Sequence, residues 1–547
     1  MTGGWWKAAA LVVGLTAVLL LTSLSLSAMA AGGSGSATGL SAFASSTSAT
    51  VVDGAFSKAT AISSSFWGVN VEPAQQFASS DAAAVAATPA TYIRYPGGVL
   101  GDELNYTSGV VTSDTGTTSK VKVSTSEFIS LCKSIGCHVI FQLPSEINDP
   151  AVAAYYASYV VKTLDYQPAY WELGNAPSGW THFGVPWSQW KDKSVPAPTP
   201  EAFADSVHAY IAAILKVDPS AKFLALGAGM GTADYAKAWV EEVVSVDGHE
   251  ISGISVHSYI LQGPAHPTDA DLLANLRGVY SLPDQINATR SYIKAACSTC
   301  TNVGVFVSEI NAAEHQVTDP YVPLLTGFVG TLYLAAEVTQ GLTLQVPNMD
   351  WFCYDCNYQG AWSEHPSQFK QQYYLFSDLA TQLKTETLPT TVTGPSTFYA
   401  ISTYNSDGLS VMMVNAGSST LSVNIAQTGF ILDRAGVTEY TWGNGTNLPV
   451  KSSVTLSSTV SVKGMSIMLL TVGSAGTKTP GAAAAGAGSS TVTGVSAPAH
   501  GIHFTTGSPV VTVPTVAAGS ALVARVPTVA RDLPEPTPNV LTMSRPL

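Results

Sequence analysis

Glu309 is the residue whose position most clearly suggests chemistry. It ends the apolar run Val305-Phe306-Val307-Ser308-Glu309, which has the composition of a buried parallel strand. A polar residue at such a strand end can simply begin a loop, or it can carry a reaction. A second run, Trp171-Glu172-Leu173-Gly174-Asn175-Ala176, ends where a partner carboxylate is expected, and it holds an alanine there. The two runs therefore offer one half of a two-carboxylate site.

Two carboxyl groups about 5 to 5.5 Å apart cleave a glycosidic bond with retention: one attacks the anomeric carbon, and the other protonates the leaving oxygen. Glu309 has the position of the nucleophile. Arg94 can hydrogen-bond that carboxylate and hold it ionised, and Tyr259 can orient it. Asn175 can bind the sugar 2-hydroxyl, whose hydrogen bond strengthens in the transition state. The methyl group of Ala176 cannot carry the proton.

Several other side chains follow strand-like runs and have two interpretations. His257 is either a proton carrier or a hydrogen-bonded structural histidine, and Glu72 is a further acid at a strand end. The loop tryptophans either stack on a pyranose or pack their own loops; Trp351 is the one we assign to the substrate site. These tryptophans are Trp180, Trp187, Trp190, Trp351 and Trp362. Surface solvation is the expected state of the remaining acids, Asp102, Glu103, Glu146, Asp149, Glu314 and Glu364.

Eight short apolar or β-branched runs alternate with helix-like or loop segments and predict the elements that position these residues. The runs are residues 66–72, 91–95, 138–143, 169–174, 222–226, 254–257, 303–308 and 349–354. This alternation favours an α/β fold, a (β/α)8 TIM barrel over residues 58–390, with function on the loops after the strands. In a doubly wound sheet, function would instead gather at one switch point.

A change to a two-residue period predicts a second, all-β domain at residues 391–473. Residues 398–415 form two alternating arms around an Asn-Ser-Asp-Gly turn, which is typical of a hairpin. The later strand-like runs are 421–425, 454–462 and 465–472. Together they predict a β-sandwich, to which residues 50–57 can add an N-terminal strand. Residues 474–547 are a low-complexity linker and a Pro-, Val- and Thr-rich tail.

The composition limits the class of partner and the compartment. The 547 residues carry a net charge of −13; 11% of them are charged and 46% are hydrophobic. Such a chain disfavours a nucleic-acid partner, which needs a Lys/Arg surface to displace counterions. Residues 1–31 have the order of a signal peptide: Lys7, an apolar stretch, and Ala28-Met29-Ala30 before the cleavage point. An uncleaved membrane anchor is the alternative. Either way, the folded part is expected to be secreted or on the cell surface.

The six cysteines fit such a compartment. They fall into three local pairs, Cys132/Cys137, Cys297/Cys300 and Cys353/Cys356. An even number in an exported chain favours disulfides, and we expect local pairing. Zinc is the alternative for the Cys-x-x-Cys pairs, although no histidine stands at a regular ligand spacing from them. We expect neither a metal nor a cofactor.

Five motifs follow one another along the chain in a recognisable order. They are Phe66-Trp67-Gly68-Val69-Asn70-Val71-Glu72, Tyr92-Ile93-Arg94-Tyr95-Pro96-Gly97-Gly98, Trp171-Glu172-Leu173-Gly174-Asn175, Val256-His257-Ser258-Tyr259 and Val307-Ser308-Glu309. In this order the chain resembles glycoside hydrolase family 79, the heparanase and β-glucuronidase family, over roughly residues 50–473. The resemblance implies a (β/α)8 barrel packed on a β-sandwich, a retaining mechanism and substrates that contain glucuronic acid.

The chain departs from this family at its acid/base residue. The family pattern after the fourth strand is Gly-Asn-Glu, and here it is Gly174-Asn175-Ala176. Glu172 is a poor replacement, because strand residues rise about 3.3 Å each and it lies roughly 13 Å below position 176. Two functions follow from this. The chain is either a secreted retaining glycosidase of the uronidase type, with Glu309 as nucleophile, or a surface protein that binds glycans without cleaving them. The partner is a glycan or glycoside in both cases, with membrane contact only through an uncleaved N-terminal segment.

Overall fold

The computed structural model describes most of residues 48–478. The described ranges are 48–74, 77–192, 197–229, 233–261, 269–276, 281–313, 327–354, 370–427, 431–432, 435–446, 448–473 and 477–478. The predicted signal peptide or anchor and nearly all of the predicted tail lie outside them. So do Cys356, Glu314, Trp362 and Glu364. Within the described ranges, no helix combines the length and apolar character needed to cross a bilayer.

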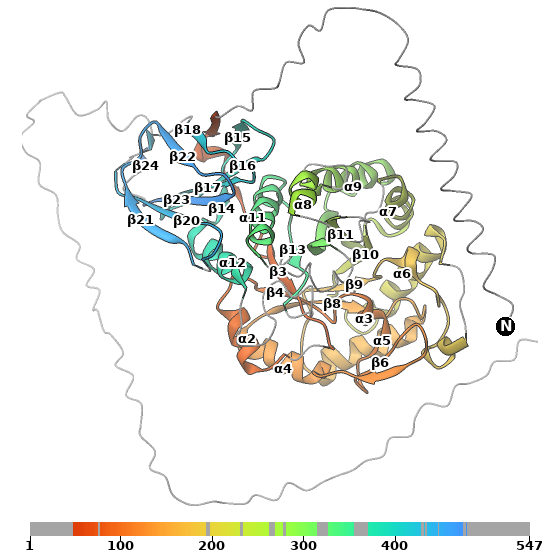
Figure 1. The fold of residues 1–547 in the computed structure, drawn as a ribbon. Coiled ribbons are helices and arrows are strands. Elements are labelled where there is room, and N and C mark those ends of the chain that lie inside the picture. Colours follow the sequence, from red (N-terminus) through yellow and green to blue (C-terminus); the bar gives the residue numbers. More distant parts are fainter. Residues whose placement is uncertain are drawn as a thin grey trace, which may run out of the picture. The chain divides into compact units, whose positions relative to one another are not determined.

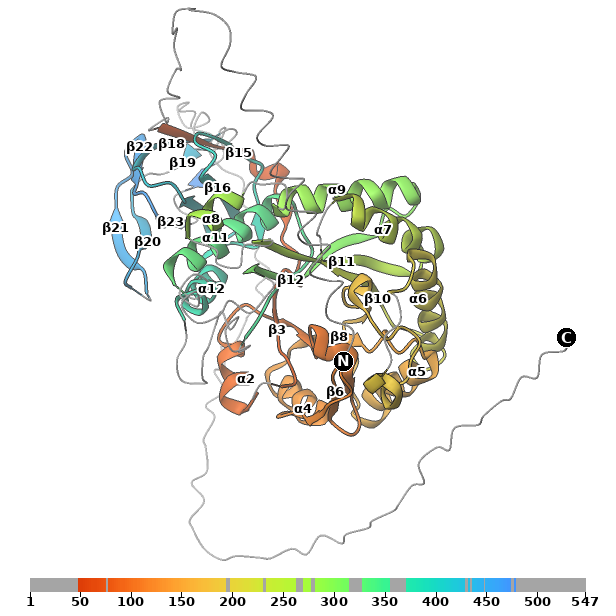
Figure 2. The ribbon, with the colours of Figure 1, turned by 45° about the vertical axis from the view of Figure 1, so that its right-hand side comes forward.

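Eight parallel strands close into a barrel, which Figure 2 shows enclosed by helices. In order around the barrel they are β3 (Trp67–Asn70), β4 (Tyr92–Tyr95), β8 (His138–Leu143), β9 (Tyr170–Leu173), β10 (Phe223–Gly229), β11 (Ile251–Leu261), β12 (Gly304–Ala313) and β13 (Met349–Trp351). Each predicted run overlaps one of these strands, so the predicted (β/α)8 barrel is confirmed. Strands β10, β11 and β12 extend beyond the predicted runs at their C-terminal ends.

Helices lie between the barrel strands and after the last of them (Figure 1). They are α2 (Ser79–Ala86), α3 (Val99–Glu103), α4 (Thr125–Ile135), α5 (Pro150–Ser158), α6 (Pro200–Leu215), α7 (Ala233–Asp247), α8 (Asp269–Asn275), α9 (Leu282–Ala296), α11 (Phe328–Thr343) and α12 (Gln371–Gln382). The caps explain several boundaries. Ser124 and Glu127 form a reciprocal capping box at the start of α4, and Gly136 ends this helix in the left-handed region, at φ 72°. Asp149, one of the predicted strand-end acids, is the N-cap of α5.

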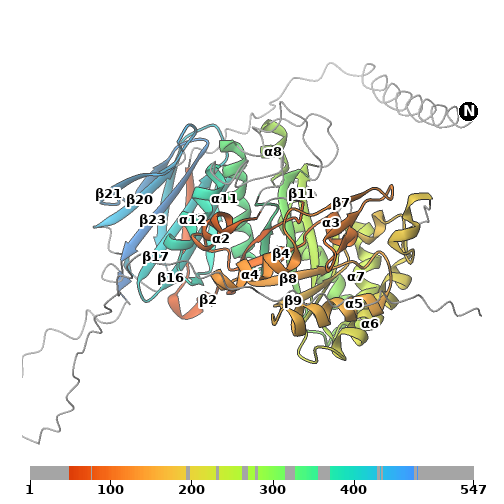
Figure 3. The ribbon, with the colours of Figure 1, turned by 90° about the horizontal axis from the view of Figure 1, so that it is seen from below.

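Two sheets form the predicted sandwich: the seven-stranded sheet is antiparallel, whereas the two central strands of the four-stranded sheet are parallel. Figure 3 shows β16, β17, β20, β21 and β23 of the seven-stranded sheet side by side. The seven-stranded sheet contains β2 (Thr60–Ala61), β14 (Glu386–Thr387), β16 (Phe398–Asn405), β17 (Gly408–Asn415), β23 (Ser466–Gly473), β20 (Val437–Trp442) and β21 (Val450–Val454). The four-stranded sheet contains β15 (Thr390–Thr393), β1 (Ser48–Asp53), β18 (Leu421–Gln427) and β22 (Thr459–Val462). The predicted hairpin and the predicted N-terminal strand are thus both present.

Two parts of the sandwich differ from the prediction. The run at 454–462 is not one strand, because β21 ends where it begins and β22 belongs to the other sheet. Strand β20 was not predicted, although it lies between β21 and β23. Short strands complete the list: β5 (Leu104–Asn105), β6 (Val110–Thr112) and β7 (Thr118–Lys120) form a sheet after α3, and β19 (Ile431–Leu432) pairs with β24 (Thr477–Lys478).

Helix α11 links the barrel to the seven-stranded sheet. It is buried over nearly its whole length and contacts β12, β16 and β17. One hydrophobic cluster continues from barrel residues to Tyr399, Met412 and Leu469 of that sheet. A second cluster fills the space between the two sheets of the sandwich. The sandwich therefore buttresses the strand that carries Glu309 through α11.

Two of the three predicted disulfides lie in the described part of the chain. Cys132 is bonded to Cys137, and Cys297 is bonded to Cys300, so local pairing is confirmed for these four residues. Cys353 is also disulfide-bonded. Its predicted partner, Cys356, lies outside the described residues.

Candidate active site

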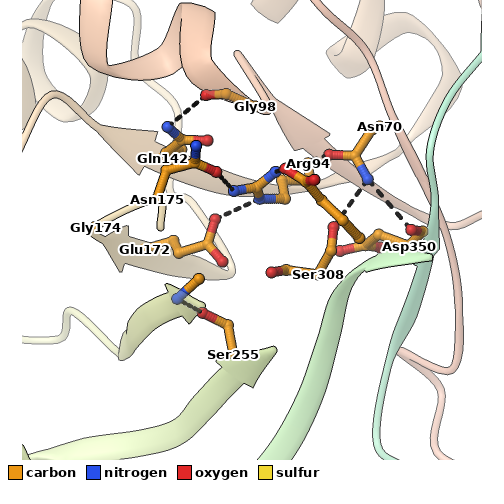
Figure 4. Close-up of polar contacts among 12 residues, drawn as sticks. Asn70, Arg94, Gly98, Gln142, Glu172, Gly174, Asn175, Ser255, Ser308 and Asp350 are labelled. Carbon is orange, nitrogen blue, oxygen red and sulfur yellow. Dashed lines mark hydrogen bonds and ion pairs between the residues drawn. The ribbon is translucent and has the colours of Figure 1, made fainter. Parts of the chain in front are cut away.

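Arg94 lies at the centre of a buried polar cluster inside the barrel (Figure 4). Its Nη1 donates to Oε1 of Glu309 at 2.7 Å and to Oδ1 of Asn70 at 3.1 Å. Its Nη2 donates to Oδ1 of Asn175 at 3.0 Å, and its Nε donates to Glu172. Five polar side chains thus come together here. They lie on β3, β4, β9 and β12 or on the loops that directly follow these strands.

Both carboxylate oxygens of Glu309 face donors. The Tyr259 hydroxyl donates to Oε2 at 2.7 Å, on the side opposite the Arg94 contact. Nδ1 of His257 lies 3.4 Å from the same oxygen. Hydrogen bonds and a neighbouring cation favour the charged form of a carboxylate, which is the form that a nucleophile needs.

Burial and charge set the protonation states around Glu309. Burial disfavours the charged guanidinium of Arg94, but Glu172 and Glu309 more than offset this and raise its pKa. Burial, followed by the charge of Arg94, lowers the pKa of His257 to about 3, so this imidazole is neutral at ordinary pH. Burial raises the pKa of Asp350 to about 8, which makes it a neutral acid in the barrel interior. The charged guanidinium of Arg94 therefore lies among neutral neighbours on its His257 and Asp350 sides.

A β-bulge in β12 aims Glu309. Val307 pairs with Val256 of β11, but the next pair is Glu309 with His257, so Ser308 is an extra residue on β12. Nδ2 of Asn70 donates to the Ser308 carbonyl at 2.8 Å and to the Asp350 carbonyl at 3.2 Å. Asn70 therefore ties the bulge in β12 to β13 and to its own strand, β3, while its side-chain oxygen accepts from Arg94.

A second bulge, in β10, fixes the backbone at Ala176. The pairing of β10 with β11 shifts between Ala225 and Ala228, and Gly227 lies in this bulge at φ 51°. The Gly227 carbonyl accepts the Ala176 N–H at 2.7 Å. Ala176 itself adopts φ 51° and ψ 56°, a left-handed conformation that is uncommon for a residue with a Cβ. The loop that should hold the acid/base group is thus ordered and pinned, but its side chain is a methyl group.

The structure brings together most of the predicted site residues. Glu309, Arg94, Asn175, Tyr259 and His257 lie in one cluster around the nucleophile position, and Ala176 directly follows Asn175. Glu72 is half-buried farther along the loop after β3. A Cβ on Gly98 would lie 3.3 Å from its Oε1 and 3.4 Å from the Phe352 ring, so these three residues are neighbours.

Trp351 faces away from this cluster. It is 2% exposed, and its ring lies 5.8 Å from that of Tyr333 on α11. Side chains alternate along a strand, so with Asp350 directed into the barrel, Trp351 points to the helices. The aromatic side chain beside the site is Phe352, whose ring lies 6.4 Å from that of Tyr259. The sequence offered only a weak signal for Phe352, namely its place directly after Trp351, the tryptophan assigned to the substrate site.

The tryptophans after β9 pack their own loop. Nε1 of Trp180 donates to the Asn175 carbonyl at 2.9 Å, and Trp190 stacks on His182 with ring centroids 4.6 Å apart. Nε1 of Trp187 donates to the Asp102 carbonyl at 3.2 Å. Of the two interpretations of these rings, loop packing is the one that their contacts support. Trp180 additionally fixes the backbone next to position 176.

Three of the acids expected at the surface are buried. Asp102 is 2% exposed and accepts from Trp180 Nε1 at 3.2 Å, Glu103 is 6% exposed, and Glu146 is 4% exposed. Burial, followed by the charge of Asp114, raises the pKa of Glu103 to about 8. Burial also raises the pKa of Glu146 to about 7, although hydrogen bonds from the His182 and Thr181 backbone oppose this. The expectation was wrong because residues 99–120 fold into α3 and the sheet β5–β7 rather than an open loop.

Two groups of side chains in the described ranges bring potential metal ligands together. They are His249, Cys297 and Cys300, and Asp114, Glu146 and His182. In the first group both sulfurs belong to a disulfide, so they are not the thiolates that zinc binds. In the second, Nδ1 of His182 lies 3.7 Å from Glu146 and hydrogen-bonds the Thr181 hydroxyl at 2.8 Å. Neither group includes a residue that contacts Glu309.

Comparisons with known proteins identify the scaffold. No family model matches the chain, and neither does any curated protein. Among solved structures, the α-L-arabinofuranosidase of Thermotoga maritima, in complex with arabinose, is 15% identical with a TM-score of 0.61; the match covers 78% of this chain and 100% of that one. The family 51 arabinofuranosidase of Xanthomonas axonopodis pv. citri is 16% identical with a TM-score of 0.62, covering 78% and 99%. The family 44 xyloglucanase of Paenibacillus polymyxa is 9% identical with a TM-score of 0.56, again covering 78% and 99%.

At these identities the likeness concerns the fold. The chain shares the barrel fold, with an additional β domain, with these glycoside hydrolases. The similar structures belong to families 51 and 44, so the finer resemblance to family 79 stays a prediction.

Proposed function

We propose that this protein binds glycosides in the barrel mouth and reacts with them through Glu309, which forms a covalent glycosyl ester as the nucleophile of a retaining mechanism. The observation that carries the proposal is the hydrogen-bonded position of Glu309 between Arg94 and Tyr259, at 2.7 Å from each. Such contacts preorganise a carboxylate for attack at the anomeric carbon. The glycoside hydrolase scaffold supports the same substrate class.

Each neighbour of Glu309 has a role in this mechanism. Arg94 stabilises the carboxylate before attack and after its release. Tyr259 orients one oxygen, so that the other approaches the sugar. Asn175 accepts from Arg94 through Oδ1, which leaves its Nδ2 as a donor for a sugar hydroxyl. His257 is neutral, so it adds no charge that would compete with Arg94 for Glu309.

The sugar class rests on the sequence motifs, which favour uronic-acid glycosides. The similar structures include an α-L-arabinofuranosidase and a xyloglucanase, so arabinofuranosides and xyloglucan are further candidate substrates. The disulfides Cys132–Cys137 and Cys297–Cys300 fit an exported protein. We therefore propose that the folded part works outside the cytoplasm, as the residue pattern of 1–31 predicts.

Covalent labelling tests the proposed function. A 2-deoxy-2-fluoro glycoside with a dinitrophenolate leaving group needs no proton donor to react, so Ala176 does not prevent its attack by Glu309. We expect stoichiometric labelling of Glu309, located by peptide mass spectrometry, with at least one sugar of a panel of glucuronide, arabinofuranoside, xyloside and glucoside. Glu309→Gln should take no label. Absence of label on the wild-type protein for every sugar would exclude the nucleophilic role.

A second candidate function is glycan binding without cleavage, which Ala176 specifically favours. Loss of a general acid slows a reaction by roughly 10² to 10⁴-fold, and glycosides with poor leaving groups are at the upper end. Calorimetric binding of oligosaccharides, combined with no label and no turnover of activated glycosides, is the result that this candidate requires.

A further inference from the structure

Position 176 combines an ordered backbone with the absence of a side chain that could move a proton. Its N–H is held by the Gly227 carbonyl at 2.7 Å, and Pro177 follows it, so the backbone has little freedom. The residue is partly exposed, whereas Asn175 before it and Pro177 after it are buried. Residue 176 is therefore partly accessible to solvent.

The described groups that contact Glu309 do not replace the lost acid/base. The Tyr259 hydroxyl already donates to Glu309, and Arg94 is a permanent cation. His257 is neutral and buried, and it places Nδ1 toward Glu309 at 3.4 Å. Its Nε2 has no hydrogen-bond partner and lies in the interior beside the bulge at Gly227, where a Cβ would come within 3.3 Å of it. These contacts favour the attack by Glu309, but none of the described residues that contact Glu309 offers a proton relay to the leaving group or the incoming water.

On the basis of the proposed function, we propose that this protein is a glycosyl transferase for activated donors: it passes a glycosyl group from a donor with an acidic leaving group to a small anionic acceptor rather than to water. The acceptor class is a carboxylate. The proposed sugar class follows from the sequence motifs and the fold. The methyl group at position 176 limits which leaving groups can depart and which acceptors can attack.

The two steps balance without a general acid or base. In the first, an oxygen lone pair of Glu309 attacks the anomeric carbon, and the bond to the leaving group breaks with its electron pair on a stable anion, such as a phenolate or carboxylate. In the second, a lone pair of the anionic acceptor attacks the same carbon, and the Glu309 carboxylate departs. No proton is transferred in either step. Two inversions give net retention, and the product is a glycosyl ester of the acceptor.

Water is the poorer acceptor at this site for a chemical reason. It must lose a proton as it attacks, and the group that takes this proton in a retaining glycosidase is the acid/base carboxylate. An anion has no proton to lose. Replacement of a glutamate by Ala176 also removes one negative charge and four heavy atoms, which lowers the repulsion and opens space for a small anion.

Steady-state and burst kinetics with azide and formate test this proposal. With 2,4-dinitrophenyl glycosides of the four-sugar panel as donors, we expect a burst of one equivalent of dinitrophenolate followed by a slow phase. Sodium azide or sodium formate should accelerate the slow phase at least about 10-fold, because the general base contributes roughly 10² to 10⁴-fold to the water reaction. Nuclear magnetic resonance should identify a glycosyl azide of retained configuration.

Two variants act as controls. Ala176→Glu restores a base for water, so its slow phase should be insensitive to azide and should yield free sugar. Glu309→Gln should show neither a burst nor a glycosyl azide.

The possible negative results distinguish failure of the transfer proposal from failure of the proposed function. If a burst occurs but neither anion changes the slow phase, and free sugar is the product, the transfer proposal is overturned while the proposed function stands. The transfer proposal also fails if rapid hydrolysis is lost in Glu314→Gln or Glu364→Gln, since that would identify a carboxylate that activates water. If no sugar gives a burst or a covalent label, the proposed function itself is wrong.

Discussion

One guanidinium, that of Arg94, hydrogen-bonds two buried carboxylates. Different nitrogens of its planar fork reach Glu172, Glu309 and Asn175, which the single nitrogen of a lysine could not do. Removing one partner from such a buried arrangement typically costs about 3 to 5 kcal/mol, because an uncompensated charge remains. Glu172 is thus explained without a catalytic step: it neutralises the cation that Glu309 shares, and it lies in the barrel below the reacting atoms.

At Ala176 the backbone is held in place, but the side chain cannot carry a proton. The backbone that should present an acid/base group is in place, with its N–H bonded to Gly227, but the proton carrier is missing. At the residue scale, the proposed nucleophile Glu309 therefore has its supporting contacts, whereas position 176 has no group that can carry a proton.

The strands that carry these residues are regular except for two β-bulges, one in β12 and one in β10. The bulge at Ser308 in β12 directs Glu309, and the bulge at Gly227 in β10 holds the Ala176 backbone. Bulges of this kind re-aim side chains next to active sites. Asn70 is the link between the Ser308 bulge, β13 and Arg94.

We expect Asn70→Ala to misdirect Glu309. The change leaves the buried Ser308 carbonyl without its donor and Arg94 without one acceptor, so the free energy of unfolding should fall by about 1 to 3 kcal/mol. The rate of labelling by the fluorinated glycoside should fall about 10² to 10³-fold, by analogy with the loss of other preorganising contacts. Urea unfolding and labelling kinetics measure the two effects.

The matched control is Asn415→Ala in the sandwich. Asn415 is equally buried and donates to the carbonyls of Ser419, Val462 and Lys463, away from the barrel. Its loss should cost similar stability without slowing the labelling. If both variants slow labelling equally, the effect of Asn70 is general destabilisation and its link to the bulge has no special role.

The sequence predicted the strands better than the details within them. Runs such as 138–143 mark barrel strands because buried parallel strands are continuous apolar segments, and the hairpin at 398–415 is marked by alternation and a turn. The bulges at Ser308 and Gly227 leave no such pattern, because they depend on the register with neighbouring strands. Asn70 was overlooked for the same reason, since its role becomes visible only when β3 lies next to β13 and β4.

Other differences arise from tertiary packing. Trp351 was assigned to the site as a loop tryptophan, but it belongs to β13, and the alternation along this strand directs it to α11. The acids after β4 and β8 were expected in solvent, because a polar residue in a loop is usually solvated. Tertiary structure instead covers Asp102, Glu103 and Glu146, and no local property of the sequence indicates this.

The whole molecule carries an unusual set of buried acids with raised pKa values. Burial, as the first cause in each case, raises the pKa of Asp53 to about 6, of Glu146 to about 7, and of Glu103, Glu337 and Asp350 to about 8. In an unfolded chain such groups titrate near pH 4. The folded protein therefore binds more protons than the unfolded chain between about pH 4 and pH 8.

Stability should consequently decrease as pH rises through this window. The stabilisation from these acids is complete below their unfolded pKa values and is lost as pH passes their folded values. We expect a higher midpoint of thermal unfolding at pH 5 than at pH 8, measured by circular dichroism at constant ionic strength. A midpoint that is constant or higher at pH 8 would contradict this assignment.

Glu337 provides a single-residue check of the same effect. It is fully buried in α11, and neither carboxyl oxygen has a hydrogen-bond partner. Glu337→Gln should raise the unfolding midpoint at pH 8 and leave it nearly unchanged at pH 5. The exposed Glu250→Gln is the control and should change neither value.

We propose that Glu309 and its described neighbours form a glycosidase site that lacks the proton carrier at position 176, and restoring this carrier is the most direct test. Ala176→Glu supplies the carboxyl group, while Ala176→Gln supplies the same shape without an acid. With unactivated alkyl glycosides of the responsive sugar, we expect kcat/KM of the Glu variant to exceed that of the Gln variant by about 10² to 10⁴-fold, the usual contribution of a general acid. A folded Ala176→Glu protein that is no faster than Ala176→Gln would contradict the claim.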